Sequence, residues 1–153
     1  MPPSLGPSNQ FAALVCVVSL VACAGGAGSA SQSERKTPVI RWYLNQGLWG
    51  EETLEVQPDG SGHYSFEPTG MTTEPRSVDF HVSESELDEI GALAKRVRFC
   101  EEKSDKPSNP DEAKPTLTLA LSDAKCEVSL WDTEWAKRSG PRELRNRIRA
   151  LYK

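Results

Sequence analysis

The sequence predicts an α+β domain built on an antiparallel sheet of five to six strands with two helices. Short stretches of alternating apolar and polar residues recur between residues 39 and 130, and tight turns join two pairs of them. Two other segments carry apolar residues at helical spacing. The predicted order is β-β-β-β-α-β-β-α, and consecutive short strands pair antiparallel. Because only two helices would cover the sheet, one of its faces is expected to be partly open.

Four strands are expected before residue 83, over 39–44, 52–56, 63–66 and 77–82. The second and third strands flank a turn at 58–62, in which proline presets φ and glycine allows positive φ. Alternation predicts one inward-facing set, which consists of Ile40, Trp42, Leu44, Tyr64, Phe66, Val78, Phe80 and Val82.

A helix is expected over 84–98, because Ser83 and Glu86 have the spacing of a capping box. Acidic residues crowd its first turn and basic residues its last, which complements the helix dipole. A second hairpin follows, with strands over 116–121 and 126–130 around a turn at 122–125. The last helix is expected over 142–151, with Leu144, Ile148 and Leu151 as its apolar line.

Charge is unevenly distributed along the 153 residues, whose net charge is −4. From Lys137 to the C-terminus there are seven Lys and Arg residues, and Glu143 is the single acid. This indicates an acidic body with a basic terminal helix. Its Arg138, Arg142, Arg145 and Arg149 can align on one side, either as a solvated face or as a contact for anionic lipid.

The N-terminal 22 residues are expected to be an export signal. Residues 11–22 are apolar, too short for a transmembrane helix of roughly 20 residues and suited to the core of a signal peptide. Leu20, Val21, Ala22 and Cys23 follow the pattern of a bacterial lipobox, which predicts that Cys23 becomes the mature N-terminus and carries a diacylglycerol with acyl chains such as palmitate. Ala22 and Ala24 also satisfy the rule for ordinary signal peptidase, which would release a soluble secreted protein instead.

The domain boundaries follow from this interpretation: a signal peptide over 1–22, a lipid-anchored flexible tether over 23–37, and one domain over 38–153. The tether begins with a Gly/Ala/Ser-rich run and would reach about 20 Å. Ala24 after the lipobox cysteine implies the outer membrane where the organism has one. The expected location is therefore the bacterial cell envelope, facing the periplasm or the surface.

Two of the four cysteines, Cys100 and Cys126, lie in the domain. Because cysteines of exported domains form disulfides in an oxidising compartment, we expect these two to pair. Two separate buried thiols are the alternative.

The layout resembles that of a family of small bacterial lipoproteins of unknown function. The resemblance covers most of 39–152 and consists of a Gly-rich loop at 47–50, the turn at 58–60, the helix opening at Ser83, and the terminal helix. More distantly, the layout is similar to emfourin, a small inhibitor of thermolysin-like metalloproteases. The chain departs from the pattern in having Gln46 and Gly47 where paired glycines are expected, and in its added cysteine pair. The resemblance implies protease inhibition as one candidate function and transfers no site residue.

No motif in the sequence predicts catalysis, a cofactor or a metal. His63 and His81 lie on different expected strands, and the acidic loop at 105–112 lacks the spacing of an EF-hand. An envelope enzyme is therefore the third candidate function. Nucleic acid binding is not expected of an exported acidic protein.

The tryptophans are the candidate interaction residues. Trp49 lies in a loop between glycines, and Trp131 and Trp135 share the strand parity opposite to the core. Exposed aromatic residues are enriched at binding sites. The alternative is that these tryptophans cover the second face of the sheet or pack under the last helix. The leading expectation is a non-enzymatic protein-binding or scaffolding module that binds an unidentified envelope protein.

Overall fold

The computed structural model describes residues 37–70, 73–107 and 111–153. Six strands form one antiparallel sheet in the order β4-β3-β2-β1-β5-β6. The strands are β1 (Ile40–Asn45), β2 (Glu51–Val56), β3 (Ser61–Glu67), β4 (Arg76–His81), β5 (Thr116–Ala120) and β6 (Lys125–Ser129). The predicted α+β class and the predicted size of the sheet are confirmed.

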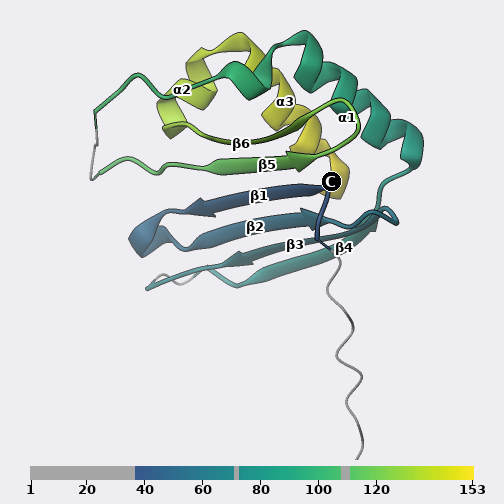
Figure 1. Ribbon diagram of the computed structural model, residues 1–153. Coiled ribbons are helices and arrows are strands. Elements are labelled where there is room, and N and C mark those ends of the chain that lie inside the picture. The colour runs from purple at the N-terminus through teal and green to yellow at the C-terminus, as the bar shows by residue number, and fades with distance from the viewer. Residues whose placement is uncertain (1–36, 71–72, 108–110) are drawn as a thin grey trace, which may run out of the picture. The chain divides into compact units, whose positions relative to one another are not determined.

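The helices cover one face of this sheet (Figure 1). They are α1 (Glu84–Arg96), α2 (Asp132–Lys137) and α3 (Ser139–Arg149), and short 3-10 turns form η1 (Gly47–Trp49), η2 (Phe99–Glu101) and η3 (Ala150–Tyr152). The expectation of two helices was wrong in missing α2. Strand parity does not continue through residues 131–135, because the chain leaves β6 at Ser129 and begins a helix three residues later, at Asp132.

The helix α1 begins as predicted and ends early. Ser83 Oγ accepts a hydrogen bond from the backbone N–H of Glu86, whose carboxylate accepts one from the N–H of Ser83, so the capping box is confirmed. The helix ends at Arg96 rather than at the predicted residue 98. Arg98 has a φ of 54°, the left-handed conformation that commonly follows a helix C-terminus.

The core lies between the sheet and the helices. Ile40, Trp42 and Leu44 are buried as predicted. Val78 and Phe80 are only partly buried, because β4 is an edge strand. The chain end reaches this edge: the ring of Tyr152 stacks on Tyr64 at 3.9 Å and lies 6.3 Å from Phe80.

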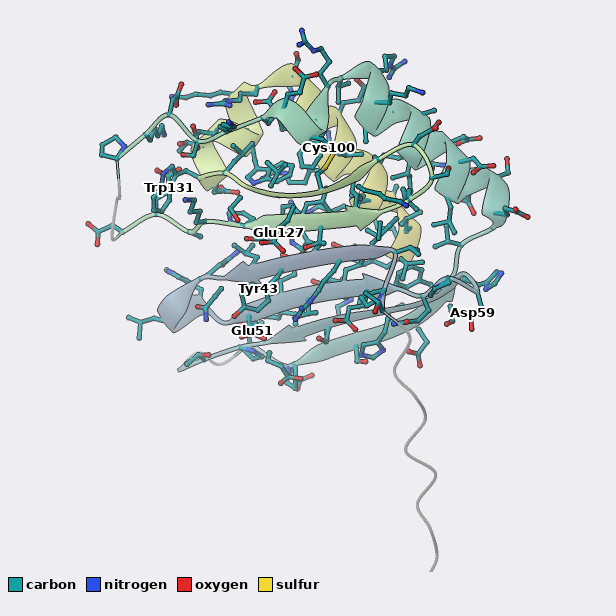
Figure 2. The ribbon with its side chains drawn as sticks, in the orientation of Figure 1. Tyr43, Glu51, Asp59, Cys100, Glu127 and Trp131 are labelled. Carbon is teal, nitrogen blue, oxygen red and sulfur yellow. A yellow bond between two sulfur atoms is a disulfide. The ribbon has the colours of Figure 1, made fainter. Side chains whose placement is uncertain are left out.

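The opposite face of the sheet is polar, in accord with the expected open face. Arg41 pairs with Glu55 across β1 and β2 at 3.2 Å, and Thr118 donates to Glu127 across β5 and β6 at 3.1 Å. Tyr43 donates to Glu51 on the same side at 3.1 Å (Figure 2). Within the described residues the helices lie on the other face, an arrangement common in antiparallel sheets.

The predicted disulfide is present. It joins Cys100 in η2 to Cys126 in β6, with 5.5 Å between their Cα atoms. The end of α1 is thereby fixed to an edge strand of the sheet. A loop closed over 26 residues of separation contributes about 3.5 kcal/mol in the chain-entropy model.

The segments on which the export predictions rest lie outside the described residues. These are the signal peptide over 1–22, the lipidated Cys23 and all of the tether over 23–37 except Thr37. They stay predictions. Within the described residues, no helix has the length and apolar character needed to cross a bilayer.

The helix layer is expected to depend on Leu144, a fully buried residue of α3. Truncating it leaves a cavity between α3 and the sheet, so Leu144→Ala should lower the free energy of unfolding by about 2–5 kcal/mol. Leu48→Ala is the matched control, because Leu48 is exposed and its truncation should change stability by about 0.5 kcal/mol or less. Urea unfolding of both variants measures this. Equal midpoints for the two would contradict the packing of α3.

Candidate protein-contact site

Two large apolar side chains are exposed to solvent at the turn between β1 and β2. Leu48 is 81% exposed and Trp49 is 60% exposed, and they are the exposed large hydrophobic residues of the described chain. We call this pair the apolar tip. The sequence offered Trp49 as a candidate interaction residue but did not single out Leu48, although an apolar pair between two glycines was the available signal.

The apolar tip is a structured turn. The backbone N–H of Gln46 donates to the carbonyl of Gly50 at 2.8 Å, and the N–H of Gly47 donates to the Asn45 side chain at 2.8 Å. Gly50 has a φ of 121°, and a Cβ there would lie 2.3 Å from the carbonyl oxygen of Glu67. Only glycine fits this position. The two exposed side chains are therefore carried on a backbone that is ordered before any partner arrives.

A groove of about 610 Å³ lies beside the apolar tip. It is formed by the turn between β1 and β2, by residues 111–113 and by the start of α2. We call it the tip groove, and its lining residues are Asn45, Gln46, Gly47, Leu48, Trp49, Asp111, Glu112, Ala113, Asp132 and Thr133. The last two were missed from the sequence because α2 was not predicted.

The wall of the tip groove opposite the apolar tip is held by the start of α2. Glu112 accepts a hydrogen bond from the backbone N–H of Thr133 at 2.8 Å and pairs with Lys106 at 3.7 Å. The carbonyl of Ala113 accepts from the N–H of Asp132 at 3.0 Å. Backbone and side-chain contacts thus fix this wall on a helix terminus.

Trp131 and Trp135 do not form an interaction surface, which corrects the expectation from strand parity. Trp135 is fully buried, with its ring edge-on to Trp42 at 5.1 Å and 5.5 Å from Phe99. Trp131 is 8% exposed, and Lys114 lies over its ring. The reason is that α2 replaces the expected strand and places residues four apart on one inward side. The alternative of packing within the domain is the correct one.

A buried carboxylate, Glu134, organises the chain behind the tip groove. It is 4% exposed and accepts hydrogen bonds from the backbone N–H groups of Trp131 and Asp105 and from Ser104 Oγ. Arg138 pairs with it at 2.8 Å. Burial alone would raise the pKa of Glu134, but these hydrogen bonds outweigh burial and hold the pKa at about 2.

The arginines of the terminal helix are largely engaged within the domain. Arg138 pairs with Glu102 and Glu134, Arg145 pairs with Asp132 at 2.8 Å, and Arg149 pairs with Glu52 at 3.4 Å. The basic helix therefore balances acidic residues of the body. These contacts favour a structural role for the arginines over contact with anionic lipid.

His63, Asp79 and Ser77 meet on the open face of the sheet. His63 Nδ1 lies 2.6 Å from an Asp79 oxygen, and Ser77 Oγ lies 3.5 Å from His63 Nε2. The order of contacts is that of a Ser-His-Asp triad. However, the side chains of Asp79 and His63 are 88% and 54% exposed. Water screens such a carboxylate, so it gives an imidazolium little of the stabilisation that a buried triad provides.

A metal site would need several ligand side chains close together. No group of three or more His, Cys, Asp or Glu residues in the described part of the chain is arranged to hold a metal ion. The acidic loop instead contributes to the tip groove through Asp111 and Glu112, and Asp105 pairs with Arg138 at 3.2 Å.

The pH dependence of stability should reveal Glu134. Its carboxylate stabilises the fold fully above the ordinary pKa of 4.5, and this contribution decreases as the pH falls toward 2. Glu134→Gln should therefore lower the melting temperature most at pH 7, with the difference from the parent narrowing below pH 4.5. Glu143→Gln, which changes an exposed partner of Arg96, is the control and should have a small effect throughout. A difference independent of pH would contradict the charged state of Glu134.

The chain was compared with models of known protein families and with curated proteins. Neither comparison finds a match. What the apolar tip and the tip groove can bind is consequently inferred from their own geometry and chemistry.

Proposed function

We propose that this chain is a lipid-anchored protein of the bacterial cell envelope whose domain binds another protein through the apolar tip. The observation that carries the proposal is the exposure of Leu48 and Trp49 on an ordered turn. A Leu and a Trp side by side in water are costly unless a partner covers them, and tryptophan is the residue type most enriched among binding hot spots.

The rigidity of the turn supports binding over incidental exposure. Internal hydrogen bonds and the fit of Gly50 against Glu67 hold the backbone, so little conformational entropy is lost when a partner docks. The adjoining tip groove adds a concave surface on which a partner can gain further contacts.

The position of the apolar tip also fits a tethered domain. The chain enters the sheet at Ile40, and the tip follows Asn45 at the other end of β1 (Figure 1). Six strand residues separate these ends by about 20 Å. The predicted tether would thus connect to the end of β1 that lies away from the tip.

Binding should depend on Trp49. Trp49→Ala should weaken binding of the partner by about 2 kcal/mol, roughly 30-fold in Kd, while the melting temperature stays that of the parent. Trp49→Phe should retain most of the affinity, and Lys125→Ala, an exposed change at the start of β6, should retain all of it.

The measurement is an affinity pull-down from envelope extract, carried out with the parent chain and with each of the three variants. The retained protein is then titrated against each of them to obtain Kd. Retention of the same protein by Trp49→Ala as by the parent would contradict the proposed contact.

Protease inhibition is the second candidate, because an inhibitor must present a rigid loop and the apolar tip is one. In that case the retained protein would be a protease. Its activity would fall on adding the parent chain and recover with Trp49→Ala. A retained protein without protease activity would favour the scaffolding function.

Lipidation is testable by itself. The mature protein should begin at Cys23 and carry the mass of a diacylglyceryl group, because the lipobox thiol is modified before cleavage. Cys23→Ala should leave an unprocessed precursor or shift the protein to the soluble fraction. Mass spectrometry of the mature N-terminus decides this, and an unmodified terminus beyond Cys23 would contradict the anchor.

A further inference from the structure

The two walls of the tip groove differ in chemistry. Leu48 and Trp49 supply its apolar side. The opposite side carries three carboxylates, those of Asp111, Glu112 and Asp132, and no Lys or Arg belongs to the described lining. An occupant of the groove would therefore contact apolar surface and carboxylate oxygens together.

Cations lie near Glu112 and Asp132. Lys106 lies 3.7 Å from Glu112, and Arg145 lies 2.8 Å from Asp132. Neither cation lines the groove. These contacts orient the carboxylates and reduce their charge without presenting a positive group to the occupant. The electrostatic preference of the groove is accordingly moderate and is directed toward cations.

We infer that the tip groove binds a Lys or Arg side chain of an extended protein segment, whose neighbouring apolar residue contacts Leu48 and Trp49. This inference rests on the proposed protein-binding function and names the chemistry of its partner. The groove volume of about 610 Å³ lies within the range of ordinary ligand sites and exceeds the needs of one long side chain.

Trp49 suits such an occupant for a second reason. The face of an indole ring attracts a cation, so a Lys or Arg side chain can be bound by the ring and by the carboxylates of the opposite wall. An aliphatic stem next to the charge also packs on Leu48. One side chain type thus satisfies both walls.

An anionic membrane surface fits less well. The apolar tip by itself resembles an interfacial anchor, because Trp and Leu favour the lipid headgroup region. The three carboxylates beside it would be brought close to anionic headgroups and repelled by them. A cationic protein segment meets no such repulsion.

The inference is tested with a displayed library of random heptapeptides, selected against the full chain. Selected peptides should be enriched in Lys or Arg next to an apolar residue. Their affinity should fall as salt is raised, because partly exposed charges are screened. Trp49→Ala should abolish selection of the same peptides.

The charge is tested by a matched pair of variants. Asp111→Asn removes one carboxylate from the groove, and Asp123→Asn removes one from the turn between β5 and β6. Both change the net charge equally. Asp111→Asn should weaken peptide binding about threefold or more, whereas Asp123→Asn should leave it unchanged.

The outcomes separate this inference from the proposed function. Peptides that require Trp49 but show no Lys or Arg enrichment, or an equal response to the two Asp variants, would overturn the inference and leave the protein-binding function standing. Failure to select any peptide that depends on Trp49 would overturn both. Binding of the chain to phosphatidylglycerol vesicles that is lost in Trp49→Ala would overturn the inference in favour of a membrane contact.

Discussion

The burial of Trp135 is the packing constraint on which the rest of the domain depends. Its ring contacts Trp42 of β1, at the centre of the sheet, and Phe99 of η2, just after α1. One side chain from α2 thereby joins three segments that are far apart in sequence. The large apolar area of such a cluster is removed from water in one place, which aligns the helix layer with the middle of the sheet.

The same short helix links stability to the candidate site. On its inner side α2 carries Trp135, and at its start Glu134 accepts hydrogen bonds from Trp131, Ser104 and Asp105. Its first two residues, Asp132 and Thr133, line the tip groove. Because one helix does all three, substitutions that loosen the core at Trp135 should also disturb the groove, and binding data need a stability measurement beside them.

The open face of the sheet and the apolar tip are two solvent-facing surfaces with different character. On the open face, charged and polar side chains satisfy one another across neighbouring strands, as Arg41 and Glu55 do. At the tip, Leu48 and Trp49 have large exposed apolar surfaces on an ordered backbone. Polar groups that are already paired with one another contribute little binding free energy when a partner covers them. Exposed apolar area contributes more, because binding removes it from water. This contrast favours the tip as the contact site.

The sequence by itself determined the features that depend on local chemistry. The capping box of Ser83 and Glu86, the 58–62 turn and the inward faces of the strands follow from hydrogen bonding and side-chain alternation within a few residues. The pairing of Cys100 with Cys126 followed because no other cysteine of the domain could compete. The position of Trp49 in a loop followed from its flanking glycines.

Tertiary structure alone decided what residues 131–135 become. Their apolar spacing fits a strand or a helix, and the helix that forms buries Glu134, whose carboxylate accepts hydrogen bonds from residues 104 and 105 as well as from Trp131. No local pattern contains the donors of residues 104 and 105. For the same reason the sequence left Trp131 and Trp135 open between an exposed and a packed position, and it missed Asp132 and Thr133. The tip groove exists because long-range packing brings the 111–113 segment beside the β1–β2 turn, a juxtaposition that alternation and capping rules do not encode.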